Sequence, residues 1–223
     1  MIASALIDQM LPSLKPSYLL EEVLEWMEES ELSQLPVVDG GRYLGLVSVG
    51  LTQDPRYSGA LLSEMPLDHS HVFAREDQHL LEMVGLAVQH QLRVIPVVSK
   101  SGDYLGAIAV TELLEKYAEA LETGERGAII VLNLPPKDYS LSEISRLVES
   151  NGAKIMMSYY TPHHAPDRAG EAFLTLKLNQ VNVAHILATL ERFGYLITEV
   201  HANEPVASVD QERLDMLMRY LAT

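Results

Sequence analysis

The sequence predicts a mixed α+β protein made of two parts, an internally duplicated N-terminal half and a smaller antiparallel sheet that follows it. Two observations predict this fold class. Residues 35–48 return as a close copy at residues 95–109, and each copy reads as two short strands joined by a glycine-containing turn. From residue 126 onwards, apolar strands and amphipathic helices follow the order βαββαβ.

Length and composition set the class of protein. The 223 residues are 48% apolar, which is ample for a packed core. Cysteine is absent, so disulfides, thiol nucleophiles and cysteine-ligated metals are excluded. No apolar run approaches the roughly 20 residues that a membrane span needs, and the first residues lack the basic start of a secretory signal. We therefore expect a cytoplasmic protein that does not enter a membrane.

The charge is strongly negative and unevenly distributed. Against 16 Lys and Arg stand 31 Asp and Glu, a formal net charge of -15 that repels a phosphate backbone, so we expect no nucleic-acid partner. Residues 1–125 hold 20 acids and 7 bases, whereas residues 126–223 hold 11 acids and 9 bases. The two parts of the chain therefore differ in electrostatic character.

The duplicated half begins with an extended segment that stops at Pro16. Ser17 is the predicted N-cap of a helix that runs to about Ser30, with one apolar and one acidic face. A hairpin and a polar loop at residues 51–60 complete the first repeat, and the same order then restarts. A shift of 60 residues places Leu20 on Leu80 and Pro36 on Pro96, which indicates a true duplication with repeats at residues 1–60 and 61–122.

This order of extended segment, helix, Pro-Val-Val strand, glycine turn, Leu-Gly strand and closing helix, given twice, resembles a tandem pair of CBS domains. The resemblance covers roughly residues 1–122. It implies two clefts that in many relatives take adenosine-containing ligands such as AMP, ATP or S-adenosylmethionine, bound as regulatory ligands and not as prosthetic groups.

Carried over residue by residue, the resemblance leaves each cleft incomplete. In ligand-binding relatives a Thr or Ser follows the strand glycine by three residues and an Asp follows three later. After Gly45 these positions are Ser48 and Leu51, and after Gly106 they are Ala109 and Glu112. The cleft with Glu112 is the one we expect to bind a ligand. Its predicted contacts are Thr111, Glu112 and the extended residues His71, Val72 and Phe73, with Ser48 in the other cleft.

Both the role of Glu112 and the kind of ligand stay open for that cleft. The carboxylate of Glu112 is equally compatible with a solvated acid that stabilises the start of a helix. The negative charge of residues 1–125 also disfavours a bare polyphosphate unless a divalent cation accompanies it, so a neutral or cationic adenosyl compound suits the field better.

Residues 126–203 predict the ferredoxin-like arrangement, a four-stranded antiparallel sheet with two helices on one face. Ser140 and Glu143 form a predicted capping box at the first helix. In size, in Asn151-Gly152 and in the Phe-Gly-Tyr before the last strand, the segment resembles an ACT domain. That resemblance implies association between modules and an amino-acid site in the first strand-to-helix loop, at the residues Asn133, Pro136, Asp138, Tyr139 and Ser140. Alternatively, Pro135-Pro136 stiffens a loop that binds nothing.

Two further stretches complete the chain. His163, His164 and Asp167 share a hairpin loop, where we expect a solvated loop and no metal site because a third, distant ligand is missing. Residues 204–223 predict a C-terminal amphipathic helix with an apolar stripe at residues 214, 217, 218 and 221.

The sequence contains no phosphate-cradling glycine loop, Gly-flanked serine nucleophile or convincing metal cluster, so we expect no enzyme. The predicted function is a ligand-sensing, homodimeric regulatory protein, in which a CBS pair binds an adenosine-containing small molecule. The ACT-like domain mediates association or binds a second small effector. The whole order resembles the CBS proteins of the acetoin-utilisation type. The alternative is a ligand-free structural dimerisation or adaptor module, and an enzyme that works through His163 and His164 is the least favoured.

Overall fold

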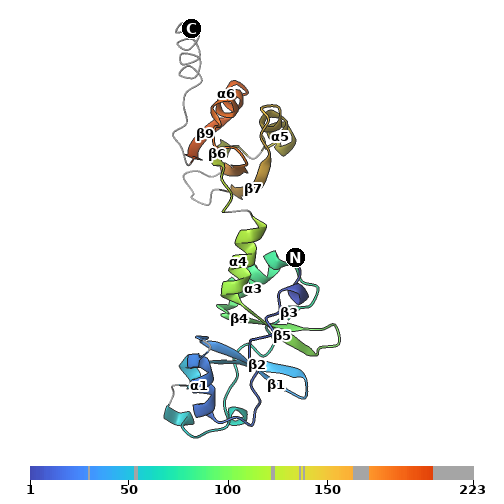
Figure 1. The fold of residues 1–223 in the computed structure, drawn as a ribbon, viewed down its shortest axis with the longest axis vertical. Coiled ribbons are helices and arrows are strands. Elements are labelled where there is room, and N and C mark those ends of the chain that lie inside the picture. Colours follow the sequence, from blue (N-terminus) through green and yellow to red (C-terminus); the bar gives the residue numbers. More distant parts are fainter. Residues whose placement is uncertain are drawn as a thin grey trace, which may run out of the picture. The chain divides into compact units, whose positions relative to one another are not determined.

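The computed structural model divides the chain into two compact units, Met1–Ala120 and Leu121–Thr223 (Figure 1). Within the described residues, no helix is long and apolar enough to cross a membrane. The predicted fold class is correct at the level of a mixed α+β chain with a duplicated first half and a C-terminal antiparallel sheet, while the finer domain boundaries stay predictions. The described residues are 1–29, 31–52, 55–121, 124–135, 137, 139–162 and 171–202.

The first repeat consists of a helix, a hairpin and a short closing helix: α1 (Leu20–Glu29), β1 (Gln34–Asp39), β2 (Arg42–Ser48) and α2 (Val49–Thr52). Helix α1 begins three residues after the predicted cap, because Leu19 forms an isolated bridge with Leu61 and its N–H donates to the Glu22 carboxylate. The loop predicted at residues 51–60 is partly wrong, since it contains the end of α2 and the 3-10 turn Pro55–Tyr57.

The second repeat has the same elements with a longer closing helix: β3 (Ala74–Arg75), α3 (Leu80–His90), β4 (Val94–Val98), β5 (Tyr104–Ala109) and α4 (Val110–Ala120). The duplication holds at the level of strand pairing. In the first repeat Leu14 forms a parallel bridge with Val37. In the second repeat Ala74 pairs in parallel with Val97, and each of these two residues lies 60 positions after its counterpart. Both hairpins also carry a bulge at the equivalent place.

The repeats exchange their leading segments. Residues 1–8 join the second repeat, where Ala3 and Leu6 are buried in the core that contains Met83 and Ile108. Residues 61–68 join the first repeat, where Leu62 and Met65 are buried with Val23 and Leu35. Backbone hydrogen bonds fix both segments, from Asp8 N–H to the Ala107 carbonyl (3.0 Å) and from Leu46 N–H to the Asp68 carbonyl (2.7 Å). Neither hydrophobic core is therefore complete within its own repeat.

The exchange explains why Tyr-Leu-Gly occurs twice. At Gly45 an added Cβ would lie 2.7 Å from Leu67 Cβ and 2.9 Å from the Asp68 carbonyl oxygen. At Gly106 an added Cβ would clash with the side chain of Ile7. Each glycine thus lets the exchanged segment approach the strand backbone closely.

The C-terminal unit has the predicted βαββαβ order: β6 (Ala128–Leu134), α5 (Leu141–Glu149), β7 (Ile155–Pro162), β8 (Ala172–Leu178), α6 (Ala184–Arg192) and β9 (Leu196–Ala202). The strands lie in the order β7-β8-β6-β9 and all pair antiparallel. Alternate residues of β6 are buried in one core with Ile144 of α5 and Ile186 of α6, so both helices cover the same face. Helix α6 begins at Ala184, whose N–H donates a hydrogen bond to the Asn182 side chain (3.3 Å).

Candidate functional site

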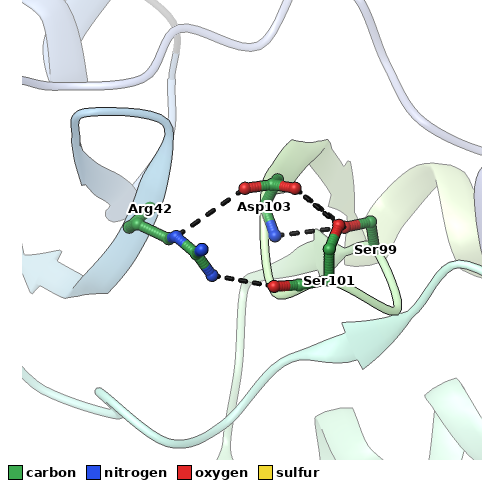
Figure 2. A network of polar contacts seen from close by, with 4 residues as sticks. All are labelled: Arg42, Ser99, Ser101 and Asp103. Atoms are coloured by element: carbon green, nitrogen blue, oxygen red, sulfur yellow. Dashed lines mark hydrogen bonds and ion pairs between the residues drawn. The ribbon is translucent and has the colours of Figure 1, made fainter.

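The two hairpins of the N-terminal unit meet at their turns. Figure 2 shows the contact, in which Arg42 donates from Nη1 to the Ser101 carbonyl (2.9 Å) and its Nε lies 3.7 Å from Asp103 Oδ1. Asp103 is held in turn by Ser101 Oγ, which donates to its carboxylate over 2.6 Å. Arg42 and Asp103 occupy equivalent positions in the two repeats. A pair of unlike charges therefore joins the repeats where a symmetric duplication would place like residues.

The candidate cleft of the first repeat contains a hydroxyl that is already bonded. Ser48 Oγ, at the end of β2, donates to Asp68 Oδ2 over 3.0 Å. Both residues are half-buried, and Asp68 belongs to the exchanged segment, whose backbone pairs with Leu46. Leu51, at the position where relatives carry an acid, lies in α2. The first cleft thus satisfies its own hydroxyl with a carboxylate.

The equivalent place in the second repeat has the carboxylate without the hydroxyl. Asp8, 60 residues before Asp68, pairs with Ala107, and its Oδ1 accepts a hydrogen bond from Met10 N–H (2.7 Å). Ala109 stands where the first repeat has Ser48. Sequence reasoning missed both aspartates as cleft residues, although their spacing of 60 residues matches the duplication and could have identified them.

Thr111 and Glu112 lie at the start of α4, where Thr111 is exposed and Glu112 half-buried. Glu112 acts on Lys116, one helical turn along. The pKa of the Lys116 ammonium is raised mainly by its hydrogen bond to Glu119, and Glu112 and Glu115 raise it further. This environment is compatible with Glu112 as a solvated helix acid and with Glu112 as a ligand contact, so its role stays a prediction.

The extended residues of the second repeat lie against β2. The Phe73 ring meets the Tyr43 ring edge-on, with centroids 6.3 Å apart, and Tyr43 O–H donates to the His69 carbonyl over 3.0 Å. Val72 packs on the second core, whereas His71 is exposed. Phe73 lines a hollow of about 390 Å³ with Arg75, Asp77, Gln78 and Glu82. Thr111 and Glu112 do not line this hollow, so the structure does not unite all predicted contacts there.

Burial changes the titration of the two tyrosines nearest the meeting point of the hairpins. It raises the pKa of Tyr43 and of Tyr104 well above the ordinary value, and the neighbouring Tyr104 raises that of Tyr43 further. Unlike Tyr43, Tyr104 has a buried hydroxyl with no hydrogen-bond partner among the described residues. Both side chains are neutral near neutral pH.

In the C-terminal unit the structure brings together three of the five predicted loop residues. Asn133, Tyr139 and Ser140 line one hollow of about 700 Å³ at the end of β6 and the start of α5. Pro136, Asp138, His163, His164 and Asp167 lie outside the described residues, as does the helix predicted at residues 204–223. The other lining residues are Leu134, Pro135, Lys137, Glu143, Glu171, Phe193, Gly194, Tyr195 and Leu196.

The hollow is polar, and charged groups of both signs line it. Asn133 Nδ2 donates to Glu171 Oε2 (3.2 Å), and Tyr195 O–H donates to Glu143 Oε2 (2.9 Å). Only the Ser140 half of the predicted capping box forms, since Ser140 Oγ accepts from Glu143 N–H over 3.4 Å while the Glu143 carboxylate is bonded to Tyr195. Tyr195 is a lining residue that the sequence did not identify, because it lies 52 residues from Glu143.

Residues 3–50, most of the first repeat, match a family model described as CBS domain. The second repeat lies outside the matched residues and is related to the first by the register described above. None of the curated proteins matches the chain.

Solved structures are similar to about half of the chain. A CBS domain pair/ACT domain protein from Thermotoga maritima is 24% identical, over 54% of this chain and 99% of the other, with a TM-score of 0.48. CBSX2 in complex with AMP is 20% identical over 53% of this chain and 96% of the other, with a TM-score of 0.47. The cytosolic domain of the Mg2+ channel MgtE in complex with ATP is 22% identical over 52% of this chain and 48% of the other, with a TM-score of 0.43.

Proposed function

We propose that this chain is a non-catalytic ligand-sensing protein, whose paired repeats bind an adenosine-containing small molecule and whose C-terminal unit is an ACT-like regulatory domain. The observation that carries the proposal is the CBS domain at residues 3–50 together with its duplication in register by the second repeat. AMP and ATP, present in two of the similar structures, and S-adenosylmethionine are the ligands to test first.

Charge favours one kind of ligand over another. Asp68 and Asp8 place a carboxylate beside the ends of β2 and β5, and residues 1–125 carry 20 acids against 7 bases. A phosphate would meet repulsion at these positions, whereas a neutral or cationic group would not. We therefore expect S-adenosylmethionine to bind more tightly than AMP, and ATP to require magnesium.

Calorimetry and thermal unfolding of the full chain with each compound test the proposal. Binding should release or absorb heat and raise the unfolding temperature, because a ligand that binds only the folded state stabilises it. Glu112→Ala should weaken binding, and Glu115→Ala, the same change of charge on the exposed side of α4, should leave it intact. No heat and no thermal shift with any adenosyl compound would refute the sensing function.

The alternative is a ligand-free structural module for association or for holding a partner. Its specific support is that the cleft groups are satisfied within the chain, Ser48 by Asp68 and Asp8 by Met10 N–H. Under this alternative Ser48→Ala lowers the free energy of unfolding, and no adenosyl compound changes the unfolding temperature of either protein.

The hollow in the C-terminal unit supports a second effector. It offers the carboxylates of Glu143 and Glu171 to an ammonium group, and Lys137 with the start of α5 to a carboxylate. This arrangement complements a free α-amino acid. A thermal-shift screen of amino acids should find one that stabilises the chain, and Glu171→Gln should abolish the shift while Glu149→Gln, at the far end of α5, retains it. A shift that survives Glu171→Gln would place the amino acid elsewhere.

A further inference from the structure

The four-stranded sheet of the C-terminal unit has a second face, opposite α5 and α6. Alternate residues of the central strands β6 and β8 are buried in the core beneath the two helices, so the residues between them point to the other side of the sheet. Strand pairing carries this side across to the edge strands β7 and β9. We call it the open face. Its apolar residues are Ile129, Val131, Met157, Tyr159, Phe173 and Leu196.

The open face does not have the composition of a solvated face. In an antiparallel sheet with one face in water, that face normally carries polar residues at alternate positions. Here every strand contributes at least one apolar residue, and Tyr159 and Leu196 are 51% and 60% exposed. The charged residues do not oppose an apolar cover, because Lys177 Nζ donates to a backbone carbonyl (3.0 Å) and His201 is hydrogen-bonded to Glu199 (3.0 Å). The open face is therefore suited to packing against another apolar surface.

The chain itself ends in a segment that needs such a surface. Residues 203–223 follow β9 directly and lie outside the described residues. Their sequence predicts a helix at residues 211–221, whose apolar stripe consists of Leu214, Leu217, Met218 and Leu221. A helix of this length is marginal in water by itself, so a stripe of this kind requires packing against another apolar surface.

We propose that the helix predicted at residues 211–221 packs its apolar stripe on the open face of its own chain. The dimensions of the two parts are compatible. Residues 203–210 can span at most about 26–29 Å, and a strand of the length of β6 extends over about 23 Å, so the chain that leaves β9 at Ala202 can return over the whole face. The predicted helix is about 16 Å long, and the axes of the four strands extend over about 14 Å.

The covalent connection favours this segment over any separate molecule. A partner joined to the sheet by so short a connection has an effective concentration on the order of millimolar at the open face, and a second copy or another protein competes only at a comparable concentration. Residues 126–223 hold 11 acids and 9 bases, so no strong repulsion keeps the segment from the sheet. The segment and the open face therefore cover each other's apolar surface within one chain.

Thiol labelling of the full chain tests this contact without background, because the chain has no cysteine of its own. Val131→Cys places one thiol in the middle of the open face, between Thr175 and Glu199. A second substitution in the apolar stripe, Leu217→Asp, should raise the rate of maleimide labelling about tenfold or more, since docking then loses the burial of a leucine side chain. Met216→Asp, the same charge on the opposite side of the predicted helix, should leave the labelling rate of Val131→Cys unchanged. Equal rates in the two double variants would overturn the proposal.

Cross-linking identifies what covers the open face, and it decides if one of these variants does not fold. A short bis-maleimide should link Tyr159→Cys to Leu217→Cys within one chain, and mass spectrometry of the digested monomer should find the two linked peptides. Glu149→Cys, exposed at the end of α5 on the other side of the sheet, should not be linked to Leu217→Cys. A link between two chains would show that a second copy covers the face, and the absence of any link would show that residues 211–221 do not lie there. Either result refutes the proposal.

Discussion

Tyr43 and Tyr104 occupy equivalent positions in the two repeats but should respond oppositely to loss of the hydroxyl. Tyr43 O–H donates to the His69 carbonyl over 3.0 Å. The Tyr104 hydroxyl is buried without a partner among the described residues. The perturbation is the removal of one oxygen atom, Tyr43→Phe or Tyr104→Phe, which leaves the packing of each ring unchanged.

The magnitudes follow from the hydrogen bonds. Tyr43→Phe removes one bond and should lower the free energy of unfolding by about 0.5–1.5 kcal/mol. Tyr104→Phe removes a hydroxyl whose desolvation is not offset by a bond, so it should raise that free energy by about 1 kcal/mol. The two variants should therefore differ by about 2 kcal/mol.

Urea unfolding, followed by circular dichroism, measures both changes as shifts of the midpoint at constant slope. The double variant checks additivity, because Tyr43 lies close enough to Tyr104 to be affected by its charge. If both single variants lose stability by the same amount, then Tyr104 has a hydrogen-bond partner and the reasoning is refuted.

Three further predictions follow. Gly45→Ala should lower the free energy of unfolding by about 2–4 kcal/mol, because the added Cβ would meet Leu67. Gly41→Ala, where the space around the added Cβ is open, should lower it by about 1 kcal/mol. Equal unfolding midpoints of the two variants in urea would contradict this. Leu6→Ala should lower the free energy of unfolding by about 2–5 kcal/mol, and it should speed amide hydrogen exchange in β4 and β5 more than in β1 and β2. Faster exchange in β1 and β2 would contradict the segment exchange. Because burial raises the pKa of both tyrosines, stability that is complete below about pH 10 should decline above it, by up to about 1.4 kcal/mol per pH unit per group; an equal decline in the double Phe variant would disprove that origin.

The repeat could be predicted from the sequence because equivalent residues of the two repeats keep a constant spacing even where their side chains differ. Leu14 and Ala74 occupy the same bridge although they share little in size, since strand pairing depends on the backbone and on burial more than on identity. The order of the C-terminal strands was predictable for a similar reason, as alternate burial along β6 is a direct pattern in the chain.

The segment exchange could not be predicted from local patterns. Ala3 and Leu6 read as part of the first repeat, and only their contacts with residues more than 70 positions later assign them to the second core. The pairing of Ser48 with Asp68 was missed for the same cause, because the acid comes from a segment that the sequence placed in the other repeat. The role of Glu112 as a ligand contact stays a prediction, because its carboxylate also lies near the charge of Lys116 in α4.

The exchanged segments also fix a sequence of events during synthesis. Residues 61–68 leave the ribosome soon after β2 and can close the first core at once. Residues 1–8 leave it about 60 residues earlier than that segment, yet their core also needs Ile108 and Leu113, about a hundred residues later. At translation rates of about 5–20 residues per second, Ala3 and Leu6 remain without their partners for roughly 5–20 s. A nascent chain stalled between these two points would therefore hold a closed first repeat and a free N-terminal segment, accessible to a protease or to a chaperone.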